Sequence, residues 1–167
     1  MNNRLPGDHR RAAGFSLLEI MIALLISAIL TIAVMSTYNL AMHKVRRAEA
    51  RAALYRAMQQ EERYYSQNSS YYLFTPLSGD ASKTSPATAV SLSFKRYSGE
   101  APTVSAYEIT ASKCTTGETE RDCIMLSATP GTAWVNKSYT DPACGALTLT
   151  SAGTKDTVPA GAAATCW

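Results

Sequence analysis

Histidine, cysteine and charge are all scarce in this chain of 167 residues. Its only histidines are His9 and His43, and none of its four cysteines forms a C-x-x-C pair, so we expect no zinc site. The sequence also lacks a phosphate-binding loop, a nucleophile elbow and any catalytic cluster that contains histidine. It therefore predicts neither an enzyme nor a protein with a metal ion or other cofactor.

The charge that is present shows almost no bias of sign. Charged residues make up 17% of the chain, below the quarter that is usual in soluble domains. The net charge is +3, and without residues 1–14 it falls to +1, from 13 basic and 12 acidic groups. A general attraction to nucleic acid is not expected from so small an excess. Abundant serine, threonine and alanine are instead typical of a secreted or surface domain.

Neither proline nor glycine interrupts residues 15–70, and the first part of this stretch is strongly apolar. Residues 15–35 contain a single charge, that of Glu19. As a helix these 21 residues measure roughly 30 Å, the thickness of a bilayer's hydrocarbon core. A secretory signal would carry its small-residue cleavage site after the apolar run, whereas here the small residues Ala12, Ala13 and Gly14 precede it. The pattern predicts a membrane-inserted helix that stays on the mature protein.

The sequence GFSLLE at residues 14–19 resembles the processing motif of type IV pilins and related pseudopilins. The resemblance implies that residues 1–14 are a leader, that prepilin peptidase cuts after Gly14, and that the new N-terminus, Phe15, is methylated. It also implies the type IV pilin fold. The expected partners are major and minor pilins and the pilus assembly machinery of the inner membrane.

Glu19 is the unusual residue of this motif, because a charged side chain in lipid costs roughly 3 kcal/mol. The resemblance implies an assembly role, in which the carboxylate pairs with the amine of Phe15 in a neighbouring subunit. A simpler alternative is that Glu19 is an acid in the first helical turn, where it is favoured by about 0.3–1 kcal/mol.

The helix is expected to continue to about Gln67 and to end in the polar cluster at residues 66–70. Its second half, residues 36–68, should pack on a sheet through one narrow apolar stripe. The stripe that we predict consists of Ala41, Val45, Ala48, Ala52 and Tyr55. The adjacent carboxylates of Glu61 and Glu62 are expected to be solvated.

A basic tract lies beside this predicted stripe. Lys44, Arg47 and Arg51 share one helical face, and we expect that face to be solvated and to contact lipid head groups or neighbouring acids. Binding of nucleic acid is possible but less expected, because no aromatic residues are interleaved with the tract.

Residues 69–167 are expected to form a globular head. A loop over residues 69–88 is followed by four segments with the pattern of strands, at residues 90–94, 107–111, 124–128 and 146–150. No helical segment separates them, so we predict an antiparallel sheet and, with the long helix, an α+β fold.

The four cysteines allow three pairings. Cys114 and Cys123 end two candidate strands and would clamp a hairpin, while Cys144 and Cys166 would close a C-terminal loop. We predict these two pairs, each worth roughly 3 kcal/mol by chain entropy. Disulfides require an oxidising compartment, which fits a head in the periplasm and later on the cell surface.

Residues 60–68, 144–153 and 165–167 resemble the PilE group of minor type IV pilins more closely than pilins in general. We therefore predict a minor pilin that is held in the inner membrane and helps to prime or enters the pilus, with motility, adhesion and DNA uptake as the processes served. A pseudopilin of type II secretion and a DNA-binding or adhesive pilin remain alternatives.

Overall fold

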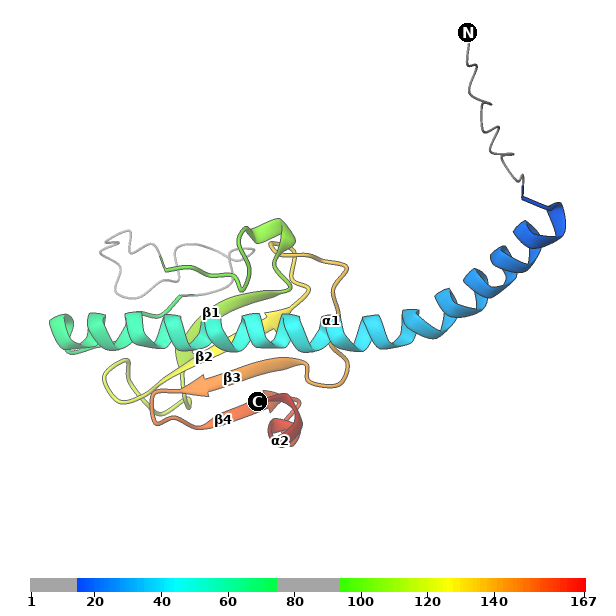
Figure 1. Cartoon of the computed structure of the whole chain (residues 1–167). Helices are drawn as coiled ribbons and strands as arrows, with labels where there is room; N and C mark the ends of the chain where they lie inside the picture. Colours follow the sequence, from blue (N-terminus) through cyan, green and yellow to red (C-terminus); the bar gives the residue numbers. More distant parts are fainter. Residues whose placement is uncertain (1–14, 75–93) are drawn as a thin grey trace, which may run out of the picture. The chain divides into compact units, whose positions relative to one another are not determined.

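The structure is a computed structural model that describes residues 15–74 and 94–167. They belong to two compact units, residues 1–40 and residues 41–167, and we call the second unit the head. Helix α1 (Leu17–Asn68) contributes its first part to the N-terminal unit and the rest to the head (Figure 1). The predicted leader, residues 1–14, lies outside the described residues.

Helix α1 ends where the sequence predicts. Its last residue is Asn68, followed by Ser69 with a positive φ of 55°, a conformation that stops helical hydrogen bonding. The amide of Ser69 still donates to the carbonyl of Tyr65 at 2.7 Å and so closes the final turn. No helix in the described ranges has the length and hydropathy needed for crossing a bilayer.

The head contains a four-stranded antiparallel sheet in the order β1-β2-β3-β4. Its strands are β1 (Tyr107–Lys113), β2 (Ile124–Pro130), β3 (Ala146–Thr150) and β4 (Lys155–Val158). The first three are the predicted strands, and the antiparallel α+β fold is confirmed. The sequence analysis missed β4, and most of the strand predicted at residues 90–94 lies outside the described residues.

Two short helical elements complete the head. A 3-10 turn, η2 (Pro102–Val104), precedes β1, and helix α2 (Ala163–Cys166) ends the chain beside β4. Gly145, at the start of β3, has a φ of +58°, and a side chain there would collide with the carbonyl oxygen of Val158. Only glycine fits at position 145, where the chain before β3 runs against Val158 at the end of β4.

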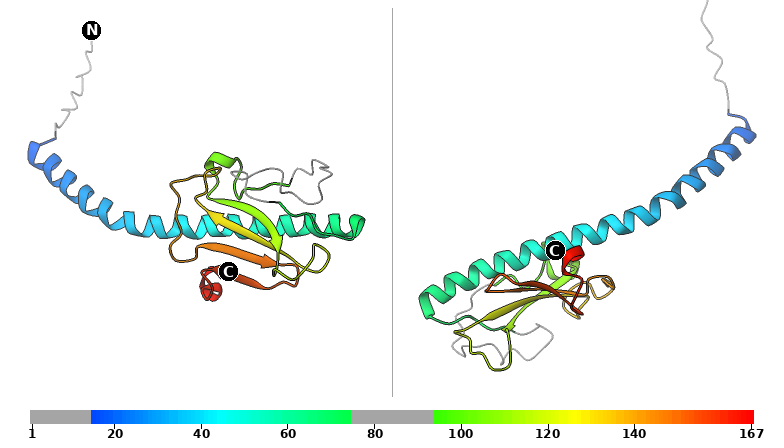
Figure 2. Two further views of the ribbon diagram at one scale, coloured as in Figure 1. Left: turned by 180° about the vertical axis from the view of Figure 1, so that it is seen from behind. Right: turned by 90° about the horizontal axis from the view of Figure 1, so that it is seen from below.

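One face of the sheet is covered by the head part of α1 (Figure 2). Alternate side chains of each strand point into this layer because successive residues of a strand face opposite sides. The helix contributes mostly alanine, which lets its backbone approach the sheet closely. The buried apolar residues from these elements are Ala50, Ala53, Leu54, Ala57, Tyr107, Ile109, Ala111, Ile124, Leu126, Ala128, Leu147 and Leu149.

The apolar stripe that the sequence predicts on α1 is wrong. Its largest members are exposed, Val45 by 50% and Tyr55 by 42%, and its three alanines are exposed too. The buried stripe is His43, Arg47, Ala50, Leu54, Ala57 and Glu61, with spacings of four and three; its first two members are half-buried. The two stripes differ by two residues, about 200° around the helix. The sequence analysis looked for apolar residues at helical spacing, and it missed the buried stripe because three of its six members are polar.

Candidate functional sites

The N-terminal segment exposes its apolar side chains and its one carboxylate together. Phe15 is 79% exposed, and Glu19 lies in the first turn of α1. Both line a hollow of about 350 Å³, whose other walls come from Ile20, Ala23, Leu24 and Ser27. The structure therefore places the two residues of the processing motif on one mostly apolar surface of the N-terminal unit.

Two hydroxyls within the apolar run are bonded inside the helix. The hydroxyl of Ser27 donates to the carbonyl of Ala23, and that of Thr31 donates to the carbonyl of Ser27, both at 2.8 Å. Such bonds hide a hydroxyl from its surroundings. The surface at residues 17–32 is consequently mostly apolar, and Glu19 carries its one charge.

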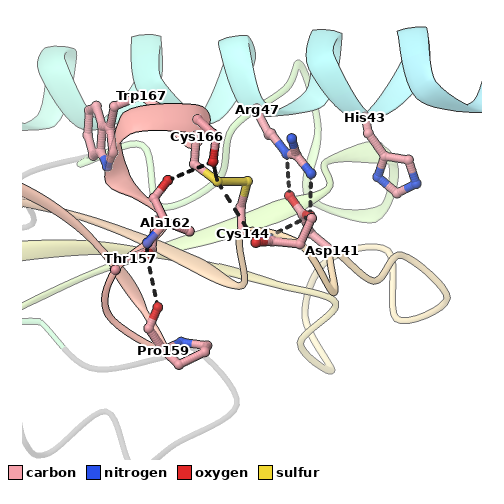
Figure 3. Close-up of a disulfide and its surroundings, with 12 residues drawn as sticks. His43, Arg47, Asp141, Cys144, Thr157, Pro159, Ala162, Cys166 and Trp167 are labelled. Atoms are coloured by element: carbon pink, nitrogen blue, oxygen red, sulfur yellow. Dashed lines mark hydrogen bonds and ion pairs between the residues drawn. A yellow bond between two sulfur atoms is a disulfide. The ribbon is translucent and has the colours of Figure 1, made fainter.

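A buried ion pair joins α1 to the loop before β3. Arg47 donates two hydrogen bonds to the carboxylate of Asp141, each at 2.7 Å, and the side chain of Asp141 is fully buried (Figure 3). The hydroxyl of Tyr107 and the amide of Cys144 donate to the same carboxylate at 2.6 and 3.2 Å. Four donors thus satisfy one buried carboxylate, as a buried charge requires.

Burial alone would raise the pKa of Asp141, but the hydrogen bonds from Arg47, Tyr107 and Cys144 hold it below its ordinary value. The hydrogen bond to Asp141 raises the pKa of Arg47, although burial opposes it. Both groups therefore stay charged at neutral pH. We call Arg47, Asp141 and Tyr107 the helix latch, because together they fix α1 to the start of the C-terminal disulfide loop.

The helix latch corrects the predicted solvated basic face. Lys44 is exposed, but Arg47 points into the head and Arg51 is half-buried. The sequence analysis grouped Lys44, Arg47 and Arg51 by their helical spacing. It did not predict that Arg47 pairs with Asp141, which lies 94 positions later in the chain.

The expectation that Glu61 is solvated is also wrong. Glu61 is fully buried, and its Oε2 accepts a hydrogen bond from the amide of Tyr72 at 2.8 Å. Burial raises the pKa of Glu61 to about 8; the bond from Tyr72 lowers it and the nearby charge of Glu62 raises it. Glu62 itself is exposed, as predicted, and accepts from the hydroxyl of Tyr71. Glu61 is thus a neutral acid that binds the amide of Tyr72 and so holds the segment after α1 against the helix.

Two disulfides close the loops of the head, and they are the pairs that the sequence predicts. Cys114–Cys123 joins the ends of β1 and β2, with Cα atoms 5.6 Å apart. Cys144–Cys166 ties the start of β3 to α2, with Cα atoms 5.8 Å apart (Figure 3). Within the described residues, the one group with metal-ligand spacing is Cys114, Glu118 and Cys123, and its two sulfurs are already bonded to each other.

Lysine lies over aromatic rings at two places on the head. In the first, which we call the Trp134 cluster, the Nζ of Lys95 is 5.1 Å from the ring centre of Tyr97, which packs on Trp134. In the second, the Trp167 cluster, the Nζ of Lys155 lies 5.6 Å from the ring centre of Tyr55 and 5.9 Å from that of Trp167. Sequence reasoning missed both, because their members are distant in the chain and follow no periodic pattern.

An N-terminal processing motif, a long first helix and a disulfide-bonded antiparallel head define the class of type IV pilins. Two family comparisons agree with this class. The prokaryotic N-terminal methylation motif matches residues 9–35, and the family described as "Type IV minor pilin ComP, DNA uptake sequence receptor" matches residues 36–148. No curated protein matches the chain.

The second match covers more than half of the chain, which belongs to the family of the type IV minor pilin ComP. The predicted minor type IV pilin is therefore confirmed, and a pseudopilin of type II secretion is not favoured. The match ends before residues 149–167, and assignment to the PilE group stays a prediction.

Proposed function

We propose that this minor pilin binds DNA and serves in its uptake. The observation that carries the proposal is the match of residues 36–148 to a family described as a DNA uptake sequence receptor. Pilins are structural subunits in general, and we propose no catalytic activity, metal or cofactor for this one. Its contribution would be to place a DNA-binding head on a pilus.

Membrane anchoring precedes assembly in this proposal. Prepilin peptidase cuts after Gly14, Phe15 is methylated, and residues 15–35 hold the protein in the inner membrane with the head in the periplasm. The N-terminal motif and the exposed apolar side chains of residues 17–32 support the membrane-anchored stage. The internally bonded hydroxyls of Ser27 and Thr31 support it too, since lipid offers them no partner.

Glu19 is proposed as the assembly residue. It shares an apolar hollow with Phe15, so a neighbouring subunit that enters the hollow would meet both groups. The methylated amine of that neighbour would provide the counter-charge that lipid lacks. Other pilins, major and minor, and the inner-membrane assembly machinery are the partners that this step requires.

Direct binding tests the DNA proposal. The full-length mature protein in nanodiscs is titrated into fluorescent single-stranded and duplex DNA at several salt concentrations, with empty nanodiscs as the control. We expect saturable binding of at least one form that weakens with salt, because phosphate contacts release counterions. Absence of binding to both forms at low salt would refute the proposal.

A further inference from the structure

We propose that the head docks on anionic lipid head groups of its own membrane before assembly, through the end at which α1 carries His43 and Lys44. The inference rests on the proposed membrane anchoring of residues 15–35 and adds a second, electrostatic contact with the same bilayer. The lipid surface, and not another protein, is the partner assigned to this end of the head.

The structure adds a second exposed lysine to this end of the head. The loop between β2 and β3 runs past α1 there, and the hydroxyl of Tyr139 lies 3.3 Å from Nδ1 of His43 (Figure 1). Lys137, two residues before Tyr139, is exposed, and so is Lys44, which follows His43 on α1. The amide of Tyr139 donates to the carbonyl of Asn136 at 3.0 Å and closes the turn that carries Lys137. Two lysines that are distant in sequence therefore lie at one end of the folded head.

The acids at this end are already matched by arginines. The carboxylate of the helix latch is bound by the arginine of the latch, and Glu49 is paired with Arg46. The groove beside Arg46 adds one more acid, Glu100, and one more cation, Arg56. Three further cations take part in no ion pair within the described ranges, namely Lys44, Arg51 and Lys137. This end of the head therefore carries a local excess of positive charge.

The opposite end of the head carries a small excess of acid. There the hydroxyl of Tyr65, near the end of α1, donates to the carbonyl of Arg121 in the hairpin tip between β1 and β2 at 3.2 Å. The helical rise from His43 to Tyr65 is about 33 Å. The charged residues of the tip are Lys113, Glu118, Glu120, Arg121 and Asp122. An anionic surface attracts the first end and repels the second, which gives docking a single orientation.

The order of the chain brings the basic end to the lipid. The exposed ring of Tyr38 follows the proposed membrane segment, and tyrosine is enriched at the interface between membrane and water. Lys44 comes six positions after Tyr38 in the same helix. Basic residues beside a membrane segment are attracted to anionic lipid, and each one contributes about fivefold to the binding equilibrium. Since Lys44 and Lys137 are both exposed and unmatched, they should contribute most to docking.

Lysine acetylation measures this contact at the residues that should make it. The full-length mature protein is placed in nanodiscs of phosphatidylcholine, with or without phosphatidylglycerol, and treated with the uncharged reagent N-hydroxysuccinimidyl acetate. Peptide mass spectrometry then gives the acetylation rate of each lysine. We expect phosphatidylglycerol to slow the acetylation of Lys44 and Lys137, and high salt to restore both rates by screening. The exposed Lys155 of β4 is the internal control, and its rate should not change.

Two substitutions test the lysines against each other. Lys44→Gln is read at Lys137, and Lys137→Gln is read at Lys44. The factor by which acetylation slows, minus one, gives the ratio of docked to free heads. Each substitution should lower this ratio about fivefold, because it removes one cation. Lys155→Gln is the matched control and should leave the rates of both lysines as they are in the wild type.

The outcomes separate this inference from the proposed anchoring. If the protein enters nanodiscs but phosphatidylglycerol slows neither lysine, slows Lys155 equally, or acts alike on all variants, the inference is wrong and the anchoring stands. If Lys44 and Lys137 are protected in assembled pili but not in nanodiscs, an acidic neighbouring subunit is their partner and the inference is again wrong. If the protein does not enter nanodiscs, both fail.

Discussion

Single polar residues decide how α1 is held on the head. Arg47 and Glu61 stand near the two ends of its buried stripe, one charged and paired with Asp141, the other neutral and bonded to Tyr72. Alanine and leucine fill the positions between them. A buried ion pair adds little net stability compared with apolar residues of similar size. Removing only one of its two partners, however, strongly destabilises the protein, because the other charge stays buried and unpaired.

Arg47→Met should therefore strongly destabilise the head. It removes the cation while leaving the carboxylate of Asp141 buried, and the free energy of unfolding should fall by about 3–5 kcal/mol. Arg46→Met is the control, since its pair with Glu49 is part-exposed and contributes about 0–1 kcal/mol. Urea denaturation followed by tryptophan fluorescence measures both, and equal losses would show that the helix latch has no special role.

Glu61 should make the head less stable as the pH rises. Its pKa is about 8 in the folded protein and near 4.5 when exposed, so its protonated form stabilises the head fully below pH 4.5. This contribution is lost as the pH rises to about 8, with a slope of up to about 1.4 kcal/mol per pH unit. Glu61→Gln, which cannot ionise, should remove that slope between pH 5 and 8.

The control for this titration is Glu100→Gln, which changes an exposed glutamate of the same head. Its unfolding free energy should follow the wild-type curve over the same pH range. A wild-type protein whose stability rises from pH 5 to pH 8 would show that Glu61 is ionised in the folded state.

At the scale of the elements, segments with a strong periodic pattern were predicted correctly, and segments with a weak pattern were not. The end of α1 and strands β1, β2 and β3 follow from a polar stop and from alternating apolar residues. Strand β4, Lys155–Val158, has four residues and one buried side chain, Thr157, which is too little pattern to read. The buried face of α1 was misassigned because alanine lies on all sides of the helix and the true stripe includes charges that find partners only in the folded head.

A pair of adjacent alanines tests which face of α1 is buried. Ala53 packs in the core, so Ala53→Leu should overpack it and lower the unfolding free energy by about 1–3 kcal/mol. Ala52 is exposed, and Ala52→Leu should change stability by less than about 0.5 kcal/mol. The reverse order in a thermal or urea unfolding series would restore the stripe first predicted from the sequence.

At the scale of the whole molecule, the sequence was most informative where the function needs a linear motif. The proposed processing and assembly roles rest on contiguous residues, so Gly14, Phe15 and Glu19 could be named directly. The Trp134 cluster draws Lys95, Tyr97 and Trp134 from two segments, and only the folded head brings them together.

Glu19 tests assembly separately from membrane insertion. Glu19→Ala and Glu19→Gln remove a charge from an apolar helix and lie beyond the proposed cleavage after Gly14, so insertion and processing should be unchanged. Entry into pili should fall for both, because neither side chain can form an ion pair with a neighbour's amine. The measurement is the amount of this protein in sheared pili relative to the membrane pool, with intact mass as the check of cleavage and methylation at Phe15. If both variants enter pili at the wild-type ratio, Glu19 has no assembly role and is only an acid that is favoured in the first turn of the helix.

The most direct test of a DNA-receptor minor pilin is deletion of its gene, with DNA uptake and surface pili measured in the same cells. We predict that entry of labelled DNA into a nuclease-resistant state is lost while pili remain, and that the wild-type gene restores uptake. Unchanged DNA uptake in the deletion strain would contradict the account.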